Sequence, residues 1–393
     1  MTTPVLPATN LDIYSDQAIL DPYPAYQTLR DLGPAVWMEK YNVWAVTRYD
    51  EVYAGLHDSE TFSSASGVAL TPETNQQLAG NTVSSDPPEH DRLRALIAPR
   101  LSPRALRAHH DEVQRRAEAL VDHLIELGTF DAVSDFAQVF PVSLVPDLIG
   151  WPEEGRDRLL EWAAAGFNTI GPMNERTVES IPAVMEMGAY TAALVQSGKL
   201  RSGGWGDELL AEGRQAGIDE PTLASLLIDY LAPSLDTTIS ALASMLYLFG
   251  EHPEQWDIVR SDTTTIPNAF NEVVRIESPI RGFYRHLKRD AVYGDVTVPE
   301  GSWALMLYAS ANRDERKWKN PEVFDVRRSA AQHVGFGHGV HSCVGQGLAR
   351  LEAHALLRAL SARVHRFEVG RPQWSLNNTI RSLQSLPVSV VPA

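Results

Sequence analysis

The chain has 393 residues, of which 44% are hydrophobic and 21% charged, a composition typical of a globular protein with a large core. Lysine and arginine together number 34 and aspartate and glutamate 50, which gives a formal net charge of −16. This negative balance argues against binding to nucleic acid or to an anionic membrane surface, because both need clustered cations.

The N-terminal half is predicted to combine a short β portion with helices. A helical pattern covers residues 21–31, strand-like runs cover 35–39 and 43–46, and helical apolar spacing dominates from about 87 to 196. Asp86, which precedes two prolines, predicts a helix N-cap followed by prolines in the first turn.

The C-terminal half is predicted to contain one exceptionally long helix. It runs over about 219–249, begins at Asp219 as N-cap and ends at Gly250. Usual helices have about 11 or 12 residues, so we expect this one to cross the molecule. A helix over 268–277 and a strand-like, turn-rich stretch to about residue 307 follow. The last helix begins after the cysteine and reaches about residue 363, so the fold class is mainly α with a small β portion.

The chain contains one cysteine, Cys343, so neither an intramolecular disulfide nor a cysteine-rich zinc module is possible. Residues 1–10 have no basic region and no apolar run, and no stretch of eighteen apolar residues occurs. We therefore predict neither a signal peptide nor a spanning helix, and a cytoplasmic protein. No repeat or linker is evident, so residues 1–393 are expected to form a single domain.

The segment around Cys343 is the most informative part of the sequence. Three nearby glycines allow tight turns and close approach to a flat ligand. Cys343 lies at the N-terminus of a helix, where the dipole and free N–H groups favour thiolate, and a thiolate can bind iron. The N–H groups of Val344 and Gly345 can then hydrogen-bond the sulfur. The alternatives are a small buried apolar side chain, or a zinc site with His338 and His341 that lacks an evident fourth ligand.

The motif itself points to a known family. The residues are Phe336-Gly337-His338-Gly339-Val340-His341-Ser342-Cys343-Val344-Gly345, continued by Leu348-Ala349-Arg350-Leu351-Glu352. This run resembles the haem-binding loop of cytochrome P-450 monooxygenases of the soluble bacterial type. The resemblance implies the cytochrome P-450 fold and a b-type haem (heme b). It also implies Cys343 as the proximal iron ligand, His341 as a contact to a haem propionate, and Phe336 and Gly345 as further haem-binding residues.

Two more groups of residues resemble parts of the same family. Glu272 and Arg275 share one helix face and, with Arg328, resemble the Glu-x-x-Arg pair and its third arginine, which implies a structural role beneath the cysteine loop. Taken alone, the pair reads as an ordinary surface ion pair.

Three further residues, His90, Arg94 and Arg285, resemble contacts to the haem propionates. Without the resemblance, the first two read as a solvated basic patch.

The long helix carries candidate catalytic residues. Pro233 in a helix interior costs about 3 kcal/mol and removes a backbone donor, so we expect a local opening that turns Asp236 and Thr237 toward a cavity. The resemblance implies that these two residues deliver protons for oxygen activation. Pro233-Ser234 departs from the family's usual Ala-Gly. The alternative is a threonine bonded back to a carbonyl and an aspartate in a local ion pair.

Within this family the chain resembles enzymes that O-demethylate para-methoxybenzoate, which implies a small aromatic substrate. The segments that carry this resemblance are Phe167-Asn168-Thr169-Ile170-Gly171-Pro172 and Asn377-Asn378-Thr379. The expected pocket residues are Phe167, Ile170, Ile228, Asp229, Ala232, Pro233, Ile280, Arg281 and Phe283. The carboxylate-binding arginines and serines of those enzymes are not matched, because loop 71–85 has no arginine and the helix positions hold Ile228 and Asp229.

A buried benzoate beside Asp229 would lack a partner. We therefore predict a neutral para-substituted methoxyphenol of the 4-alkylguaiacol type. Arg281 keeps open the alternative of an O-demethylase or hydroxylase of a para-substituted benzoate.

The resemblance also implies O₂ as a substrate and electrons from NAD(P)H through a ferredoxin and/or a flavin reductase. We expect that partner to be acidic and to dock on Arg100, Arg104 and Arg107. The competing classes are a peroxide-using haem enzyme, which would lack the acid–alcohol pair, a non-catalytic haem-binding sensor, and a helical interaction protein with an inert cysteine.

Overall fold

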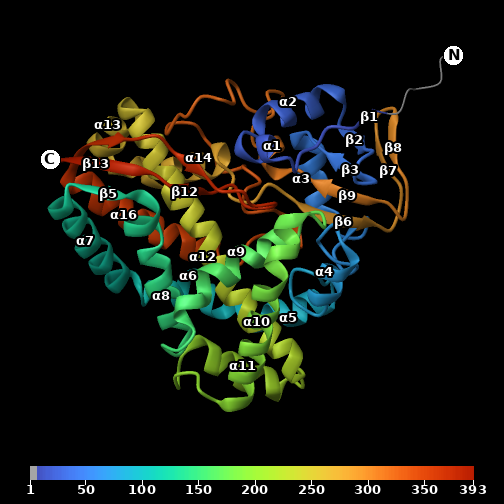
Figure 1. Cartoon of the computed structure of the whole chain (residues 1–393), viewed down its shortest axis with the longest axis horizontal. Helices are drawn as coiled ribbons and strands as arrows, with labels where there is room; N and C mark the ends of the chain where they lie inside the picture. Colours follow the sequence, from blue (N-terminus) through green and yellow to red (C-terminus); the bar gives the residue numbers. More distant parts are fainter. Residues whose placement is uncertain (1–6) are drawn as a thin grey trace.

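Helices dominate the fold, and the strands gather at two ends of the molecule (Figure 1). The computed structural model describes residues 7–393, so the first six residues of the stretch tested for a signal peptide lie outside the described part. In that part the α-helices are α1 (Asp16–Leu20), α2 (Tyr23–Leu32), α3 (Tyr49–His57), α4 (Pro72–Gln77), α5 (Glu89–Ile97), α6 (Pro103–Arg107), α7 (His110–Leu127), α8 (Val139–Ile149), α9 (Leu159–Thr169), α10 (Glu175–Ser197), α11 (Trp205–Gln215), α12 (Glu220–Glu251), α13 (Pro253–Ser261), α14 (Ile266–Ile276), α15 (Tyr308–Ala311) and α16 (Gln346–Arg363).

Short helical turns of other types connect several of these helices. They are η1 (Ala98–Leu101), η2 (Ala132–Ala137), η3 (Arg156–Arg158), η4 (Thr263–Thr265) and η5 (Gly339–His341). One helical stretch, Ala132–Ile149, is long and apolar enough to pass a test for a membrane span, but 56% of it is buried inside the protein. A core helix passes the same test, so this finding is weak evidence for a span.

The strands form two main sheets and two small pairs. The strands are β1 (Ala8–Thr9), β2 (Ala35–Met38), β3 (Val43–Val46), β4 (Phe62–Ser63), β5 (Thr129–Asp131), β6 (Phe283–Leu287), β7 (Ala291–Tyr293), β8 (Val296–Val298), β9 (Trp303–Met306), β10 (Val364–Val369), β11 (Gln373–Trp374), β12 (Leu383–Ser385) and β13 (Pro387–Pro392). The larger sheet has the order β1-β2-β3-β9-β6-β4 and the smaller one β10-β13-β5, while β7 pairs with β8 and β11 with β12. The predicted fold class, mainly α with a small β portion, is confirmed.

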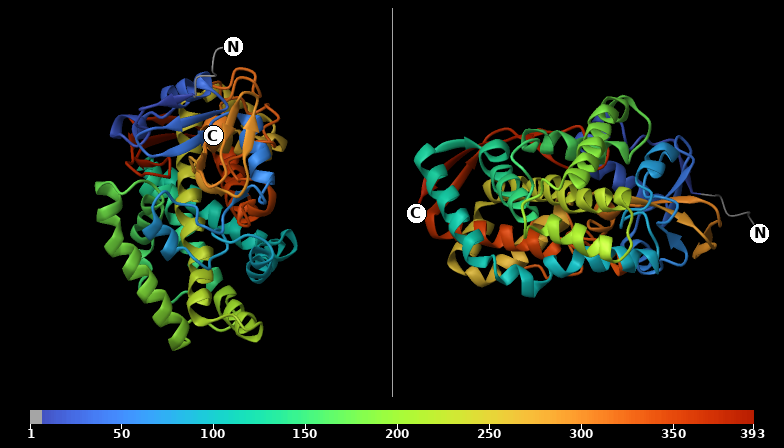
Figure 2. Two further views of the ribbon diagram at one scale, coloured as in Figure 1. Left: turned by 90° about the vertical axis from the view of Figure 1, so that its right-hand side faces the viewer. Right: turned by 90° about the horizontal axis from the view of Figure 1, so that it is seen from below.

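Helix α12 organises the molecule. With 32 residues at 1.5 Å each, α12 is about 48 Å long, and it runs through the middle of the molecule in all three views (Figures 1 and 2). It packs against α8, α9, α10 and α14. Asp219 caps it by accepting a hydrogen bond from the Thr222 N–H at 2.8 Å, as predicted. The helix continues past Gly250 to Glu251.

The predicted N-cap at Asp86 is wrong. Helix α5 begins after Pro88, and no side chain caps it. The Asp86 carboxylate instead accepts hydrogen bonds from Ser63 Oγ at 2.5 Å and the Ser64 N–H at 2.8 Å, and pairs with Lys288 Nζ at 2.8 Å. These contacts come from β4 and from the end of β6, which the local sequence around Asp86 does not contain.

Candidate functional site

A cavity of about 670 Å³ lies between α12 and the loop that carries Cys343. Its walls come from α9 and α10, from the segment after α4, and from α5, β6 and the start of α16. The volume is in the range that holds a cofactor or a small organic ligand. The cavity therefore joins the cysteine loop and the predicted substrate residues in one space.

The loop before α16 places the Cys343 sulfur in this cavity. The Cys343 N–H donates to the Phe336 carbonyl at 2.7 Å, which closes the loop. Gly339 has a φ of 66°, and a Cβ there would lie 2.2 Å from the Leu56 carbonyl oxygen, so the loop can pack against α3 only with glycine. The phenyl ring of Phe336, stacked under the Arg350 guanidinium at 4.6 Å, lines the same cavity.

Two effects act on the Cys343 thiol in opposite directions. Burial raises its pKa, whereas the N–H groups of Gly345 and Gln346 donate to the sulfur and, with the charges of Arg94 and Arg350, lower it. The donors at the start of α16 are thus Gly345 and Gln346 rather than Val344. A sulfur that receives two N–H bonds at a helix N-terminus is arranged to carry negative charge.

Cationic and donor groups converge on the cysteine side of the cavity. Arg94 Nη2 donates to the Ser342 carbonyl at 2.7 Å, and Arg285 Nη1 donates to the Tyr284 carbonyl at 2.7 Å. Both guanidiniums line the cavity and have further N–H groups that can donate to a ligand there. His341 also lines it.

His90 lies behind His341, with their ring centroids 4.5 Å apart, and is not itself a lining residue. The buried Nε2 atoms of both rings find no hydrogen-bond partner within residues 7–393.

These groups fit a flat ligand with two carboxylates and a thiolate-bound metal. Two arginines and two histidines with unused donors meet the need of buried carboxylates for hydrogen-bonded cations. A haem has this combination of charges and shape, so the residues present fit the cofactor that the motif implies.

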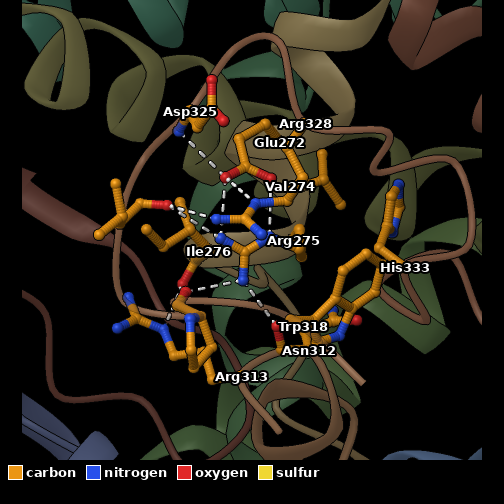
Figure 3. Close-up of polar contacts among 12 residues, drawn as sticks. Glu272, Val274, Arg275, Ile276, Asn312, Arg313, Trp318, Asp325, Arg328 and His333 are labelled. Carbon is orange, nitrogen blue, oxygen red and sulfur yellow. Dashed lines mark hydrogen bonds and ion pairs between the residues drawn. The ribbon is translucent and has the colours of Figure 1, made fainter. Parts of the chain in front are cut away.

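Beneath the loop lies a buried ion cluster (Figure 3). The Glu272 carboxylate receives Arg275 Nε at 2.7 Å and Nη2 at 2.8 Å, Arg328 Nε at 3.0 Å and the Asp325 N–H at 3.1 Å. Glu272 and Arg275 are both fully buried. Arg275 Nη1 also donates to the Asn312 carbonyl, and the Asn312 side chain accepts the Val334 N–H at 2.7 Å. The predicted trio is brought together and connected to the segment that leads into the cysteine loop.

The predicted opening of the long helix is wrong, because α12 is continuous through Pro233. Two hydroxyls bond back to carbonyls one turn earlier: Ser234 Oγ donates to the Tyr230 carbonyl at 2.6 Å and Thr237 Oγ1 to the Pro233 carbonyl at 2.5 Å. Thr237 lines the cavity, whereas Asp236 is not among its lining residues. Burial alone raises the pKa of Asp236 to about 7.

Most of the predicted pocket is brought together. The cavity-lining residues among those predicted are Phe167, Ile170, Ile228, Asp229, Ala232, Pro233, Ile280 and Phe283. Asp229 Oδ2 accepts a hydrogen bond from the Thr82 N–H at 3.1 Å, and burial raises the pKa of this carboxyl to about 6. Within residues 7–393, the lysine and arginine side chains that line the cavity are Arg94 and Arg285, both on the cysteine side.

Arg281 does not line the cavity, which corrects the sequence-based expectation. Its guanidinium is buried elsewhere and donates Nη2 to the Ile19 carbonyl at 3.1 Å. In a regular strand, side chains three residues apart point to opposite faces. Ile280 and Phe283 nevertheless both line the cavity, so the alternation of side chains is broken between them. Gly282 lies against β9, where a Cβ would meet the Met306 carbonyl oxygen at 2.2 Å, and this close approach shifts the alternation.

The proposed docking patch also needs correction. Arg100 is buried, with Nε 2.9 Å from Glu208 and Nη2 2.7 Å from Glu212 on α11. It therefore tethers α11 to η1 and is not offered to a partner. Arg104 and Arg107 remain exposed on α6.

Sequence reasoning missed the part of the cavity formed by α10 and by the segment around Thr82. Val184, Met185, Met187 and Gly188 line the cavity from α10. The signal in the sequence was weak: Val184, Met185 and Met187 are apolar residues close together on α10, a pattern that a helix face in the protein core also has.

Three comparisons with known proteins agree with this geometry. The family model for cytochrome P450 matches residues 206–379. Cytochrome p450 CYP199A2 of Rhodopseudomonas palustris is 38% identical, over 99% of this chain and 95% of that protein. Cytochrome P450 monooxygenase PikC of Streptomyces venezuelae is 33% identical, over 98% of this chain and 95% of that protein.

Solved structures have the same fold. The haem domain of CYP116B5 from Acinetobacter radioresistens aligns with a TM-score of 0.88 at 25% identity, over 97% of each chain. Cytochrome P450 CREJ in complex with (4-ethylphenyl) dihydrogen phosphate aligns with a TM-score of 0.86 at 28% identity, over 95% of this chain and 98% of that one.

Proposed function

The chain belongs to the cytochrome P450 family, and we propose that this monooxygenase O-demethylates a neutral para-substituted methoxyphenol of the 4-alkylguaiacol type. One observation carries the choice of substrate. Asp229 lies in the substrate part of the cavity, where the lining residues of the described chain include no lysine or arginine. We also propose that residues 1–393 form one domain, because α12 contacts elements from both halves of the chain.

The haem is held by its iron ligand, Cys343, and we assign the propionates to His90, Arg94, Arg285 and His341. When bound, this cofactor supplies the redox chemistry that activates O₂. The chain's contribution is to fix the sulfur through the Gly345 N–H, to neutralise two buried carboxylates and to enclose the reacting groups.

Proton delivery is assigned to Thr237 and Asp236. The Thr237 hydroxyl lines the cavity and needs only to turn from the Pro233 carbonyl to reach a ligand there. With a pKa of about 7, the Asp236 carboxyl can both hold and release a proton near neutral pH. We assign to this pair the route by which protons reach the cavity.

The substrate ring is placed between Phe167 and Phe283, with its methoxy group toward Thr237 and its para substituent toward Ile228 and Asp229. Asp229 lies eight residues before Thr237, about 12 Å along the helix, so the two residues line different parts of the cavity. The alignment with a structure that contains a 4-ethylphenyl compound supports a para-alkyl arene as ligand.

The overall reaction converts ArOCH₃, O₂, NAD(P)H and H⁺ into ArOH, formaldehyde, water and NAD(P)⁺. The two electrons are assigned to a separate ferredoxin and/or flavin reductase in the cytoplasm. Arg104 and Arg107 are the cations offered to an acidic partner on α6. Because exposed charges are screened beyond about 8 Å at physiological salt, reduction should slow as salt rises.

Charge selection in the cavity gives the deciding test. A benzoate would be desolvated beside Asp229 without a cation, whereas each CH₂ of an alkyl chain gains about 0.8 kcal/mol on burial. We expect affinity to rise from 4-methyl- to 4-ethyl- to 4-propylguaiacol, measured by the spectral shift on substrate binding, and formaldehyde to form on turnover. Tighter binding of 4-methoxybenzoate than of 4-propylguaiacol would establish the benzoate alternative. Binding without any turnover would favour the haem-sensor alternative.

A further inference from the structure

A second, smaller cavity lies outside the substrate site, next to the buried guanidinium of Arg281. This side chain is only 5% exposed. Its Nη2 donates to the Ile19 carbonyl at 3.1 Å, but its Nε and Nη1 are buried and find no partner within residues 7–393. Two donors of a permanently charged group are therefore directed into the protein interior without an acceptor.

The surrounding charges do not balance Arg281. Glu277 is shared between Arg313 and Arg381, at 3.2 Å from each, and Arg313 has Glu322 as a further partner. Three buried guanidiniums thus share two carboxylates.

Over the described part of the chain no carboxylate lies within ion-pair distance of Arg281, and the second cation, Arg381, acts on it unfavourably. One positive charge is left uncompensated in the interior, which is costly.

The cavity beside Arg281 has room for one small particle. Its volume is about 10 Å³, and Tyr14, Tyr26 and Tyr284 line it together with Asn378. That space is about the size that holds one water, so we expect a single small particle there, a water or a monatomic ion, rather than a larger oxyanion.

The tyrosines lining this cavity supply donors rather than a counter-charge. The hydroxyls of Tyr14 and Tyr284 are 2.5 Å apart, so one donates to the other and one O–H stays free to donate elsewhere. Burial raises the pKa of Tyr14, Tyr26 and Tyr284, so all three stay neutral at physiological pH.

We propose that Arg281 and these tyrosines bind a monatomic anion of the halide class, with chloride as the physiological ligand. A water can accept hydrogen bonds from two of these donors and leaves the charge uncompensated, whereas a halide can accept from several donors and neutralises the charge. The bound anion would join the segment around Tyr14 to β6 and to the loop at Asn378. Ile170 lines both this cavity and the substrate cavity, so the anion would also support one wall of the active site.

The test is thermal unfolding of the holoenzyme in chloride, bromide or sulfate at matched ionic strength. Above the dissociation constant, each tenfold increase in chloride should raise Tm by about 2 °C, and sulfate should not. Arg281→Met should remove the chloride dependence. Arg104→Met, on the exposed surface of α6, is the control and should retain it.

Crystals of the unaltered protein grown in bromide give a test that does not depend on the variant folding. We expect an anomalous scattering peak within hydrogen-bond distance of Arg281 Nε. An equal effect of all salts on Tm, together with no anomalous peak at this position, would show that the cavity holds water and would overturn the proposal.

Discussion

Substitution of Glu272 by glutamine tests the cluster beneath the cysteine loop. The carboxylate accepts four hydrogen bonds, three from the guanidiniums of Arg275 and Arg328 and one from the Asp325 N–H. Glutamine keeps one acceptor oxygen but turns an NH₂ toward the remaining donors and leaves two guanidiniums without a counter-charge. Breaking a buried pair in this way costs about 3–5 kcal/mol, a large part of the 5–15 kcal/mol that stabilises most proteins.

The free energy of unfolding is measured by urea titration, with far-UV circular dichroism as the signal, and the haem retained after gel filtration is a second readout. Glu112 is the matched control, because it contacts Arg115 and Arg116 one turn away on the solvent-facing side of α7. Exposed pairs contribute little, so we expect Glu112→Gln to leave the urea midpoint unchanged. A loss below about 1 kcal/mol for Glu272→Gln would refute the argument that the cluster holds the loop.

Three further predictions concern the site itself. Cys343→Ala should abolish the red-shifted absorption band of the reduced, carbon monoxide-bound protein; a variant that keeps the band would disprove the ligand assignment. Thr237→Ala should still bind substrate but form several-fold less product per NAD(P)H, with peroxide as the other product. Burial raises the pKa of Asp236 from its ordinary value of 3.8 to about 7. Between these two pH values the native protein therefore holds a proton that the unfolded chain has released, so the free energy of unfolding falls as the pH rises to 7. Asp236→Asn should flatten the dependence of unfolding free energy on pH between 4 and 7 by up to about 1.4 kcal/mol per pH unit, and an unchanged slope would show that Asp236 ionises normally.

Elements whose pattern is local could be predicted from the sequence. The strand over Val43–Val46 has its predicted bounds, because four consecutive apolar residues lie between turn residues and are all buried. Helix α16 could be located because the glycine-rich loop before it must turn sharply. The smaller sheet was missed. Strands β10 and β13 both lie near the C-terminus, but β13 also pairs with β5, whose residues come more than 250 positions earlier in the chain.

The same distinction separates the residues assigned to the haem from those assigned to substrate selection. Cys343, His341 and Gly345 belong to one continuous loop, so their spacing in the sequence already determines their spacing in space. Arg94 and Arg285 were identified only through the resemblance, since nothing local brings α5 and β6 together. The helix that carries Thr237 was predicted correctly in position but not in conformation, because α12 continues through Pro233, with two hydroxyls bonded back to carbonyls one turn earlier.

The residues to which we assign substrate selection depend on long-range contacts. Asp229 is held in the cavity by an N–H donor 147 residues earlier, at Thr82, and Arg281 is drawn out of it by a carbonyl 262 residues earlier, at Ile19. Both residues were predicted to lie in the pocket, yet the fold keeps the acid there and removes the cation. The remaining arginines of the cavity lie on its cysteine side, where haem carboxylates would use them. Among the lining residues of the described chain, Asp229 is the charged side chain at the far end, and from this asymmetry we predict that the cavity rejects an anionic arene and accepts a neutral one.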